Sequence, residues 1–182
     1  MEYFAKLKRD FNLSEFEKVR DVISYGVDYV EEFKGIQYSR VKIPNMADVY
    51  HTLPKEYRKF FGLNLMRINT KVPTHTDSNI KTCINFYIKT EPCVTYFHEP
   101  IVDNPRTYQI NNQSDGYMFN EEDLKRVASF TAKPNEAWIL DVKKPHSVVP
   151  LFGISERRAF TLATNHFTFD EVCDMLKETG NL

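Results

Sequence analysis

Glycine is scarce in this sequence: 6 of the 182 residues are glycine. Nucleotide-binding loops place several glycines close together, because the backbone there must approach the phosphate groups. Neither the G-x-G-x-x-G pattern nor the G-x-x-x-x-G-K-[ST] pattern occurs in the chain. We therefore do not expect a glycine-rich phosphate-binding site.

Cysteine is also rare, and no two cysteines form a C-x-x-C pair. The odd number of cysteines (Cys83, Cys93 and Cys173) argues against a disulfide framework, so we expect reduced thiols and a cytoplasmic protein. The first ten residues carry charges throughout and lack the apolar core of a signal peptide. No stretch approaches 18 consecutive apolar residues, which predicts that no segment crosses a membrane.

The sequence has no excess of one charge sign. Its 24 Lys and Arg residues face 25 Asp and Glu residues, for a net charge of -1. The two signs are interspersed and form no basic stripe, which disfavours nucleic acid as a partner. Aromatic residues are frequent, at 14%, and such residues favour strands and line pockets.

The first third of the chain shows helical features. A capping box, Ser14-Glu-Phe-Glu17, precedes apolar residues at helical spacing and predicts a helix that runs to Tyr25. Residues 38–43 alternate like a strand, and further short helices are expected over 45–50 and 54–61. We interpret residues 1–62 as the helical N-terminal part of a single domain that covers residues 1–182.

The pattern changes after residue 62, where short strands separated by turns are predicted. These strands cover residues 63–68, 83–88, 93–97, 137–142 and 159–164. Residues 99–119 are polar and rich in turn residues, and their length predicts a substrate-facing loop or hairpin. A second capping box at Thr168 opens a C-terminal helix over 168–180. Strands without alternating helices indicate a sandwich or barrel, with its core over about 63–166.

Three residues of metal-binding types lie in this strand-rich part. His75 and Asp77 are two residues apart in KVPTHTDSN, and His146 follows the predicted strand AWILDV. Alternate residues of an extended segment face the same side, so His75 and Asp77 can both point into a barrel. Two imidazoles and one carboxylate on one face of a metal form the facial triad of non-heme Fe(II) oxygenases.

Two arginines, Arg157 and Arg158, follow His146 at the start of the strand RRAFTLAT. A guanidinium group is a rigid fork that can bind a carboxylate through two parallel hydrogen bonds. Alternation puts Arg157 on the face with a small and a hydroxyl neighbour, and Arg158 on the face with Phe160 and Leu162. We favour Arg157 as the pocket residue, and the reverse holds if the Phe160 face lines the barrel.

The segments LMRINTKVPTHTD, CINFYI, NEAWILDVKKPHSV and SERRAFTLAT together resemble the iron(II)- and 2-oxoglutarate-dependent oxygenases, in particular prolyl- and aspartyl-hydroxylase-like members. The resemblance spans Leu65 to Thr164, a little over half of the chain. It implies a mainly β protein with flanking helices, folded as a double-stranded β-helix, that is, a cupin-like jelly roll. It also implies that His75, Asp77 and His146 are the catalytic metal ligands, with Fe(II), 2-oxoglutarate and O₂ as cofactors.

The same resemblance implies that Arg157 or Arg158 holds the far carboxylate of 2-oxoglutarate. Asn85 and Tyr87 alternate on one face of CINFYI and are further cofactor-binding candidates, while Arg67 is a candidate for substrate binding. The implied activity is hydroxylation of an amino acid, a peptidyl side chain or another small molecule.

Two other classes of function are compatible with these residues. The triad could hold Zn²⁺ and activate water for hydrolysis, although this leaves the arginine unexplained and offers no obvious general base. A non-catalytic jelly-roll binding module needs no triad, and it predicts that replacing His75 changes stability alone. The histidines His98 and His166 are not in register with the triad, and we interpret them as loop or strand-end histidines.

Overall fold

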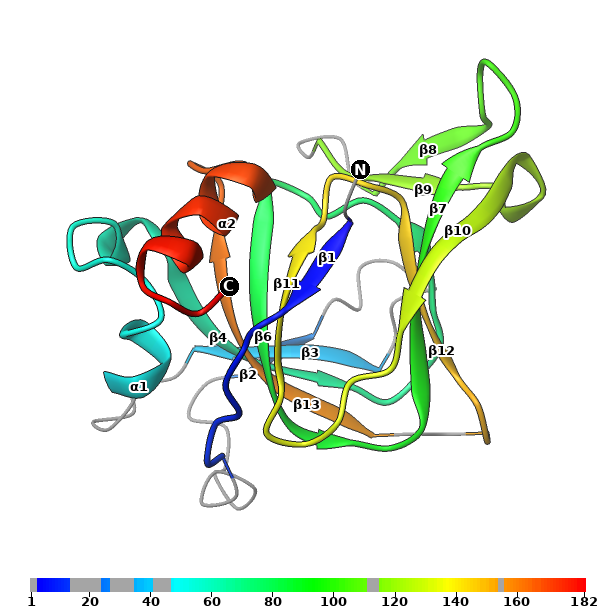
Figure 1. Ribbon diagram of the computed structural model, residues 1–182. Helices are drawn as coiled ribbons and strands as arrows, with labels where there is room; N and C mark the ends of the chain where they lie inside the picture. Colours follow the sequence, from blue (N-terminus) through cyan, green and yellow to red (C-terminus); the bar gives the residue numbers. More distant parts are fainter. Residues whose placement is uncertain (1–2, 14–23, 27–34, 41–46, 111–114, 154–155) are drawn as a thin grey trace.

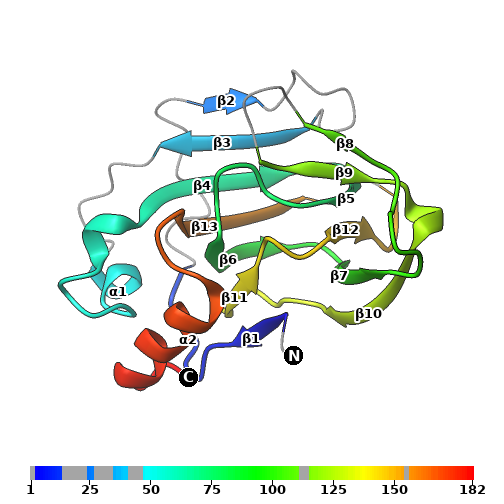
Figure 2. The ribbon, with the colours of Figure 1, turned by 90° about the horizontal axis from the view of Figure 1, so that it is seen from above.

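The computed structural model describes residues 3–13, 24–26, 35–40, 47–110, 115–153 and 156–182. In these ranges the chain forms two antiparallel sheets that face each other, with few helices (Figures 1 and 2). This arrangement confirms the predicted jelly-roll fold. No helix in the described ranges is long and apolar enough to cross a membrane.

The larger sheet has seven strands. In spatial order they are β1 (Phe4–Lys6), β11 (Ala137–Asp141), β6 (Thr82–Thr90), β13 (Arg157–Thr164), β4 (Gly62–Ile68), β3 (Ile36–Arg40) and β2 (Ser24–Gly26). The smaller sheet has six strands: β10 (Leu124–Phe130), β7 (Cys93–Pro100), β12 (His146–Pro150), β5 (Val72–His75), β9 (Tyr117–Phe119) and β8 (Thr107–Gln109).

The helical elements are short except for the last. They are α1 (Ala47–Tyr50), the 3-10 turns η3 (Arg58–Phe60) and η4 (Glu121–Asp123), and α2 (Phe169–Glu178). The predicted capping box opens α2: Glu171 N donates to Thr168 Oγ1, and Thr168 N donates to Glu171 Oε2. These bonds satisfy backbone groups that the first turn of a helix leaves without an internal partner.

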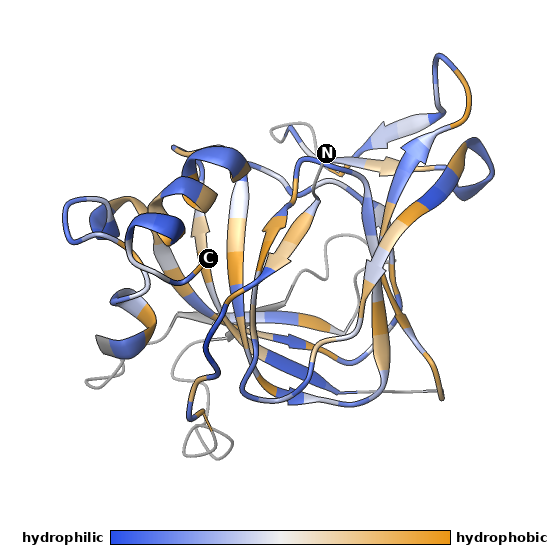
Figure 3. Ribbon diagram, viewed as in Figure 1, coloured by the Kyte–Doolittle hydropathy of each residue, from blue (hydrophilic) through white to orange (hydrophobic). Residues whose placement is uncertain are grey.

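One face of the larger sheet packs against α2, with hydrophilic residues on the outward side of that helix (Figures 1 and 3). Strand alternation sends apolar side chains of β6 and β13 to this face, where the core includes Ile84, Phe86, Phe160, Leu162, Phe169, Val172 and Leu176. The alternate residues of the same strands face the space between the two sheets. Both faces of these central strands are therefore buried, as the dense apolar run of β6 indicates.

An aromatic cluster fills the space between β1 of the larger sheet and β7 and β10 of the smaller one. Phe4 contacts Phe97, Phe130 and Trp138, and the rings of Phe130 and Trp138 stack with centroids 4.3 Å apart. Such pairs stabilise the contact by about 0.5–1.5 kcal/mol beyond the area they bury. The cluster joins the two sheets at this side.

Strands in the N-terminal part correct the prediction that residues 1–62 are mainly helical. β1 lies at one edge of the larger sheet and β3 and β2 lie at the other, and β3 confirms in part the strand predicted over 38–43. Tyr25, the predicted end of a helix, lies in a strand that pairs with β3, while residues 14–23 lie outside the described residues. The helix expected over 54–61 is reduced to η3. Edge strands gain hydrogen bonds from a distant neighbour, which helical periodicity in the local sequence does not register.

The segment over residues 99–119 contains a hairpin, one of the two forms predicted for it. β8 pairs with β9, and β9 pairs with β5 opposite His75. The hairpin thus adds two strands to the smaller sheet beside the first residue of the predicted metal triad.

Candidate metal centre and pocket

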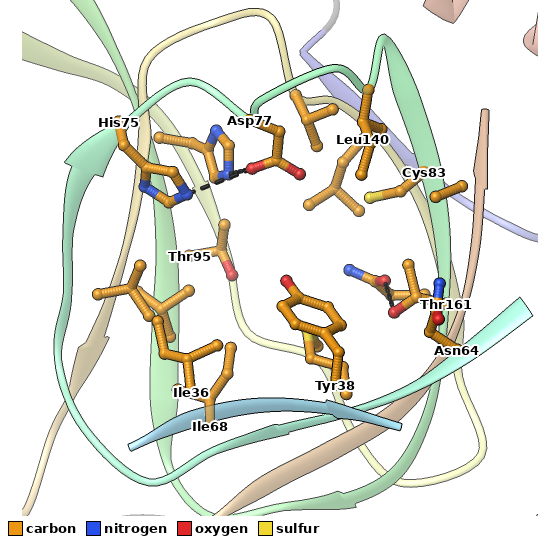
Figure 4. A pocket seen from close by; sticks show the side chains of 18 of the residues that line it. Ile36, Tyr38, Asn64, Ile68, His75, Asp77, Cys83, Thr95, Leu140 and Thr161 are labelled. Carbon is orange, nitrogen blue, oxygen red and sulfur yellow. Dashed lines mark hydrogen bonds and ion pairs between the residues drawn. The ribbon is translucent and has the colours of Figure 1, made fainter. Parts of the chain in front are cut away.

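The pairing of β5 with β12 brings the two predicted histidine ligands together. His75 ends β5, His146 begins β12, and the two residues are direct partners across the antiparallel ladder. Their ring centroids are 4.4 Å apart. Asp77 follows β5 by two residues, and its Oδ1 lies 3.2 Å from His75 Nε2 and 3.4 Å from His146 Nε2. Residues separated by about seventy positions in sequence therefore form one compact donor group (Figure 4).

Hydrogen bonds orient both imidazole rings. Nδ1 of His75 lies 2.9 Å from the carbonyl oxygen of Pro73, and Nδ1 of His146 lies 3.0 Å from that of Lys144. A carbonyl oxygen accepts, so each Nδ1 is the donor, and the Nε2 of each ring faces Asp77. Bonds of this kind fix the tautomer and ring orientation of metal-ligating histidines.

The donor set fits a divalent cation. All three donor atoms lie within 4.8 Å of one another. Metal–ligand bonds of about 2.0–2.2 Å place neighbouring ligand atoms roughly 3 Å apart, which agrees with the two separations from Asp77 Oδ1. Two imidazole nitrogens and a carboxylate oxygen that converge on one point repel one another unless positive charge, either protons or a metal ion, lies between them.

The electrostatics of the group also favour positive charge. Burial opposes ionisation of Asp77, but hydrogen bonds from His146 and His75 outweigh it and hold the pKa of the carboxyl well below its usual range. Burial acts to lower the pKa of His146, yet its contact with Asp77 more than offsets this and the pKa is raised. The carboxylate is thus ionised and available as a ligand.

The triad lies at the wall of a pocket of about 310 Å³ between the two sheets (Figure 4). The floor of this pocket follows the register of the larger sheet. Asn64, Thr161 and Asn85 form one row across β4, β13 and β6. Much of the remaining lining is apolar, from residues such as Ile36, Ile68, Val72, Leu140 and Val148. The pocket therefore combines a polar row and a metal-type donor group with water-excluding walls.

Arg157 lies in this pocket with a largely unpaired guanidinium. The residue is 2% exposed, and its Nη1 donates to Thr95 Oγ1 at 2.8 Å. Its Nε and Nη2 are buried and have no hydrogen-bond partner in the described part of the chain. Burying a cation without an anionic partner is costly, so this position favours an anionic ligand.

Arg158 and Arg67 do not line the pocket. Arg158 follows Arg157 on β13 and takes the opposite face, and it pairs with Arg67 on β4. Arg67 Nε lies 3.7 Å from Glu156 Oε1, outside the pocket. The structure thus places Arg67 and Arg158 outside the lining of the pocket that contains the triad.

Asn85 and Tyr87 both line the pocket from β6. Thr161 Oγ1 donates to Asn85 Oδ1 at 2.8 Å, and this bond turns Asn85 Nδ2 towards the hydroxyl of Tyr87, 3.5 Å away. Burial raises the pKa of Tyr87, so its phenol stays protonated and can donate a hydrogen bond.

Sequence reasoning missed several pocket residues. Tyr38 projects from β3 into the centre of the pocket, with Asn64 and Thr161 beside it (Figure 4). Thr95 reaches the pocket from β7. The sequence signal for these residues is their spacing: Asn64 and Met66 are two residues apart on β4, and Thr95 and Phe97 are two residues apart on β7. It identifies one face of a strand, but it does not say which strand lies opposite the metal triad.

No protein-family model matches the chain, and no curated protein matches it either. Among solved structures, E. coli ycfD is 8% identical, with a TM-score of 0.44 and coverage of 76% of this chain and 36% of that one. A vicilin from Capsicum annuum is 13% identical, with a TM-score of 0.39 and coverage of 85% and 32%. The chain spans about a third of the length of these two proteins.

An L-ribose isomerase from Cellulomonas parahominis, solved with L-psicose, is 16% identical, with a TM-score of 0.36 and coverage of 81% and 73%. The described chain is a cupin-like jelly roll with a His–Asp–His group that can bind a metal ion.

Proposed function

We propose that this protein is an Fe(II)- and 2-oxoglutarate-dependent dioxygenase that hydroxylates an amino acid, a peptidyl side chain or another small molecule. One observation carries the proposal: the buried, partly unpaired guanidinium of Arg157 shares a pocket with the donor group His75, Asp77 and His146. A metal triad alone serves many chemistries. A triad beside a buried unpaired arginine fits a cosubstrate that chelates a metal at one end and carries a carboxylate at the other.

In this proposal His75, Asp77 and His146 hold Fe(II) as a facial triad, which leaves coordination positions open for other ligands. Fe(II) with 2-oxoglutarate and O₂ supplies an oxidation strong enough for an unactivated C–H bond. The chain's own residues hold the ligands in place. The bonds from His75 to Pro73 and from His146 to Lys144 direct each Nε2 to the position that the metal would occupy.

Arg157 would bind the far carboxylate of 2-oxoglutarate through the nitrogens that have no protein partner. Thr95, which accepts from Arg157, pairs with Val148, while His146 pairs with Phe97. Thr95, which holds Arg157, and Phe97, which lies opposite His146, are thus two residues apart along β7, or roughly 7 Å. This separation suits a short dicarboxylate held at both ends. The protonated hydroxyl of Tyr87 and the amide of Asn85 supply further donors along the pocket floor.

The apolar walls exclude water from the reacting groups, which strengthens electrostatic contacts inside the pocket. The alternative functions explain fewer of these features. A zinc hydrolase leaves Arg157 without a role, and apart from Asp77 the described lining offers no carboxylate as a general base. A binding module leaves the convergence of three metal-type donors without a role.

The test is an anaerobic titration of the metal-free protein with Fe(II) and then 2-oxoglutarate, followed through the visible metal-to-ligand charge-transfer band. We expect the band in the wild type and its loss in His75→Ala. Arg157→Gln should weaken 2-oxoglutarate binding by roughly 10- to 100-fold, because hydrogen bonds to a charged group contribute about 1.5–3 kcal/mol. Arg158→Gln is the matched control and should bind as the wild type does. A well-folded wild type that shows no band would contradict the proposal.

A further inference from the structure

Asp77 is the one member of the donor group that lies outside the strands, so other contacts must hold its loop. Its backbone N–H donates to the carbonyl oxygen of Val142 at 3.0 Å. Its own carbonyl oxygen accepts from Lys143 Nζ, also at 3.0 Å. The next residue, Lys144, supplies the carbonyl that orients His146. Three consecutive residues of the turn between β11 and β12 therefore hold two of the three donor residues.

Lys143 also reaches the hairpin that carries β9. Its Nζ lies 2.6 Å from Asp115 Oδ2, and Asp115 Oδ1 accepts from the backbone N–H of Asn79 at 2.5 Å. The ion pair is partly exposed, with side-chain exposures of 31% for Lys143 and 59% for Asp115, so as an isolated pair it contributes little to stability. Its geometric effect is larger, because one ammonium group joins the carbonyl of Asp77 to a carboxylate bound two residues further along the same loop.

The backbone of the hairpin that carries β9 also hydrogen-bonds to the loop that carries Asp77. Thr76 N donates to the carbonyl of Tyr117, and Tyr117 N donates to Thr76 Oγ1. Gly116 of the hairpin lies so close to this loop that a Cβ added to it would lie 2.4 Å from Ser78 Oγ and 2.9 Å from the carbonyl oxygen of Thr76. These contacts flank Asp77 on both sides, so the position of the metal-type carboxylate depends on the fit of the hairpin.

We propose that Lys143, braced by Asp115, is a positioning residue that clamps the Asp77 loop in the geometry required for metal binding. The inference rests on the metal centre of the proposed function and extends it to residues that do not contact the metal. Lys143 acts through the Asp77 backbone and not through the carboxylate. The clamp therefore sets where the ligand atom lies, while the ligand chemistry stays with Asp77.

The test is a titration of the metal-free full chain with Co(II), followed by calorimetry and by its visible absorption, without 2-oxoglutarate. Lys143→Met should weaken Co(II) binding by roughly 10- to 100-fold, the usual effect of losing a group that orients a metal ligand. Lys71→Met is the matched control, since it also removes a lysine from an ion pair, with Glu121 at 3.0 Å, that does not touch the Asp77 loop. It should leave the affinity unchanged.

Two further variants separate positioning from general stability. Lys143→Arg keeps a cationic donor and should recover most of the Co(II) affinity. Gly116→Ala forces the hairpin away from the loop and should also weaken Co(II) binding. The melting temperature of metal-free Lys143→Met should stay close to that of Lys71→Met, because both lose one partly exposed ion pair.

Equal Co(II) affinity in Lys143→Met and Lys71→Met would overturn the clamp, and so would a wild type that binds no Co(II). A loss of affinity in Lys143→Arg as large as in Lys143→Met would overturn it as well. Because the measurement uses Co(II) alone, failure of the 2-oxoglutarate band in the wild type would count against the dioxygenase and leave the clamp supported by its own data.

Discussion

The guanidinium of Arg157 stacks on the ring of Tyr87, with Cζ 4.5 Å from the ring centroid. Stacking and the bond from Nη1 to Thr95 together fix the plane of the fork. An aromatic face offsets part of the cost of burying a cation, by roughly 0.5–2 kcal/mol. Tyr87 thus stabilises a charged group whose remaining donors have no partner in the described residues.

Two replacements of Tyr87 separate the contribution of its ring to 2-oxoglutarate binding from that of its hydroxyl group. Tyr87→Phe keeps the ring under Arg157 and should weaken 2-oxoglutarate binding by about 3- to 10-fold, the equivalent of one hydrogen bond. Tyr87→Leu also removes the stacking surface and should weaken binding further. Both affinities can be measured by anaerobic titration of the Fe(II)-loaded protein. Equal affinities in the two variants would argue against a role for the ring.

The buried His98 should make stability depend on pH. Its Nε2 lies 2.9 Å from Ser147 Oγ, and burial, followed by the positive charge of Arg126, lowers the pKa of His98 from 6.5 to about 4. Between these values the unfolded chain takes up a proton at this residue that the folded chain does not, so the contribution of His98 to stability is fully present above pH 6.5 and is lost as the pH decreases towards 4.

The measurement is the urea midpoint as a function of pH for the wild type and His98→Gln. The loss of stability between pH 6.5 and 4 should be smaller in the variant, because glutamine does not titrate. An unchanged slope would show that other groups cause the pH dependence. NMR titration of the His98 ring gives an independent reading of the same pKa.

The cap of α2 should contribute measurably to stability. Thr168→Ala removes the side-chain oxygen that accepts from Glu171 N, and the expected cost is about 1 kcal/mol in the free energy of unfolding. Thr168→Ser keeps that oxygen and should cost much less. Denaturant unfolding of the two variants checks this, and equal losses would assign the effect to the threonine methyl group.

Replacing Phe160 tests how much the core between the larger sheet and α2 contributes to stability. Its side chain is fully buried, so Phe160→Ala should destabilise the fold by about 3–5 kcal/mol through lost burial and a residual cavity. Phe160→Leu keeps most of the volume and should cost less than about 1.5 kcal/mol. Because Phe160 faces away from the pocket, Co(II) affinity of the folded Phe160→Leu variant should match the wild type. A large loss of affinity would mean that this core sets the metal geometry.

Local sequence was sufficient for the features that depend on local geometry. Alternation in β6 and β13 has a period of two, set by the pleat of the backbone, and it put Arg157 and Arg158 on opposite faces as the structure has them. The capping box that begins at Thr168 marked the start of α2, because its two hydrogen bonds are made within four residues. The spacing of His75 and Asp77 likewise indicated a shared side, although Asp77 lies beyond the end of β5 and is held by contacts with Val142 and Lys143.

Tertiary structure decided what depends on distant strands. The pairing of β12 with β5 brings His146 opposite His75, and the register between β13, β4 and β6 assembles the polar row of the pocket. Residues 24–26, which were predicted to lie at the end of a helix and beyond it, became a strand because a sheet edge was available to pair with them. The contact of Lys143 with the Asp77 loop had no local signal at all. Such contacts follow from how whole sheets pack, since register is specified by burial across the sheet and not by neighbouring residues in the chain.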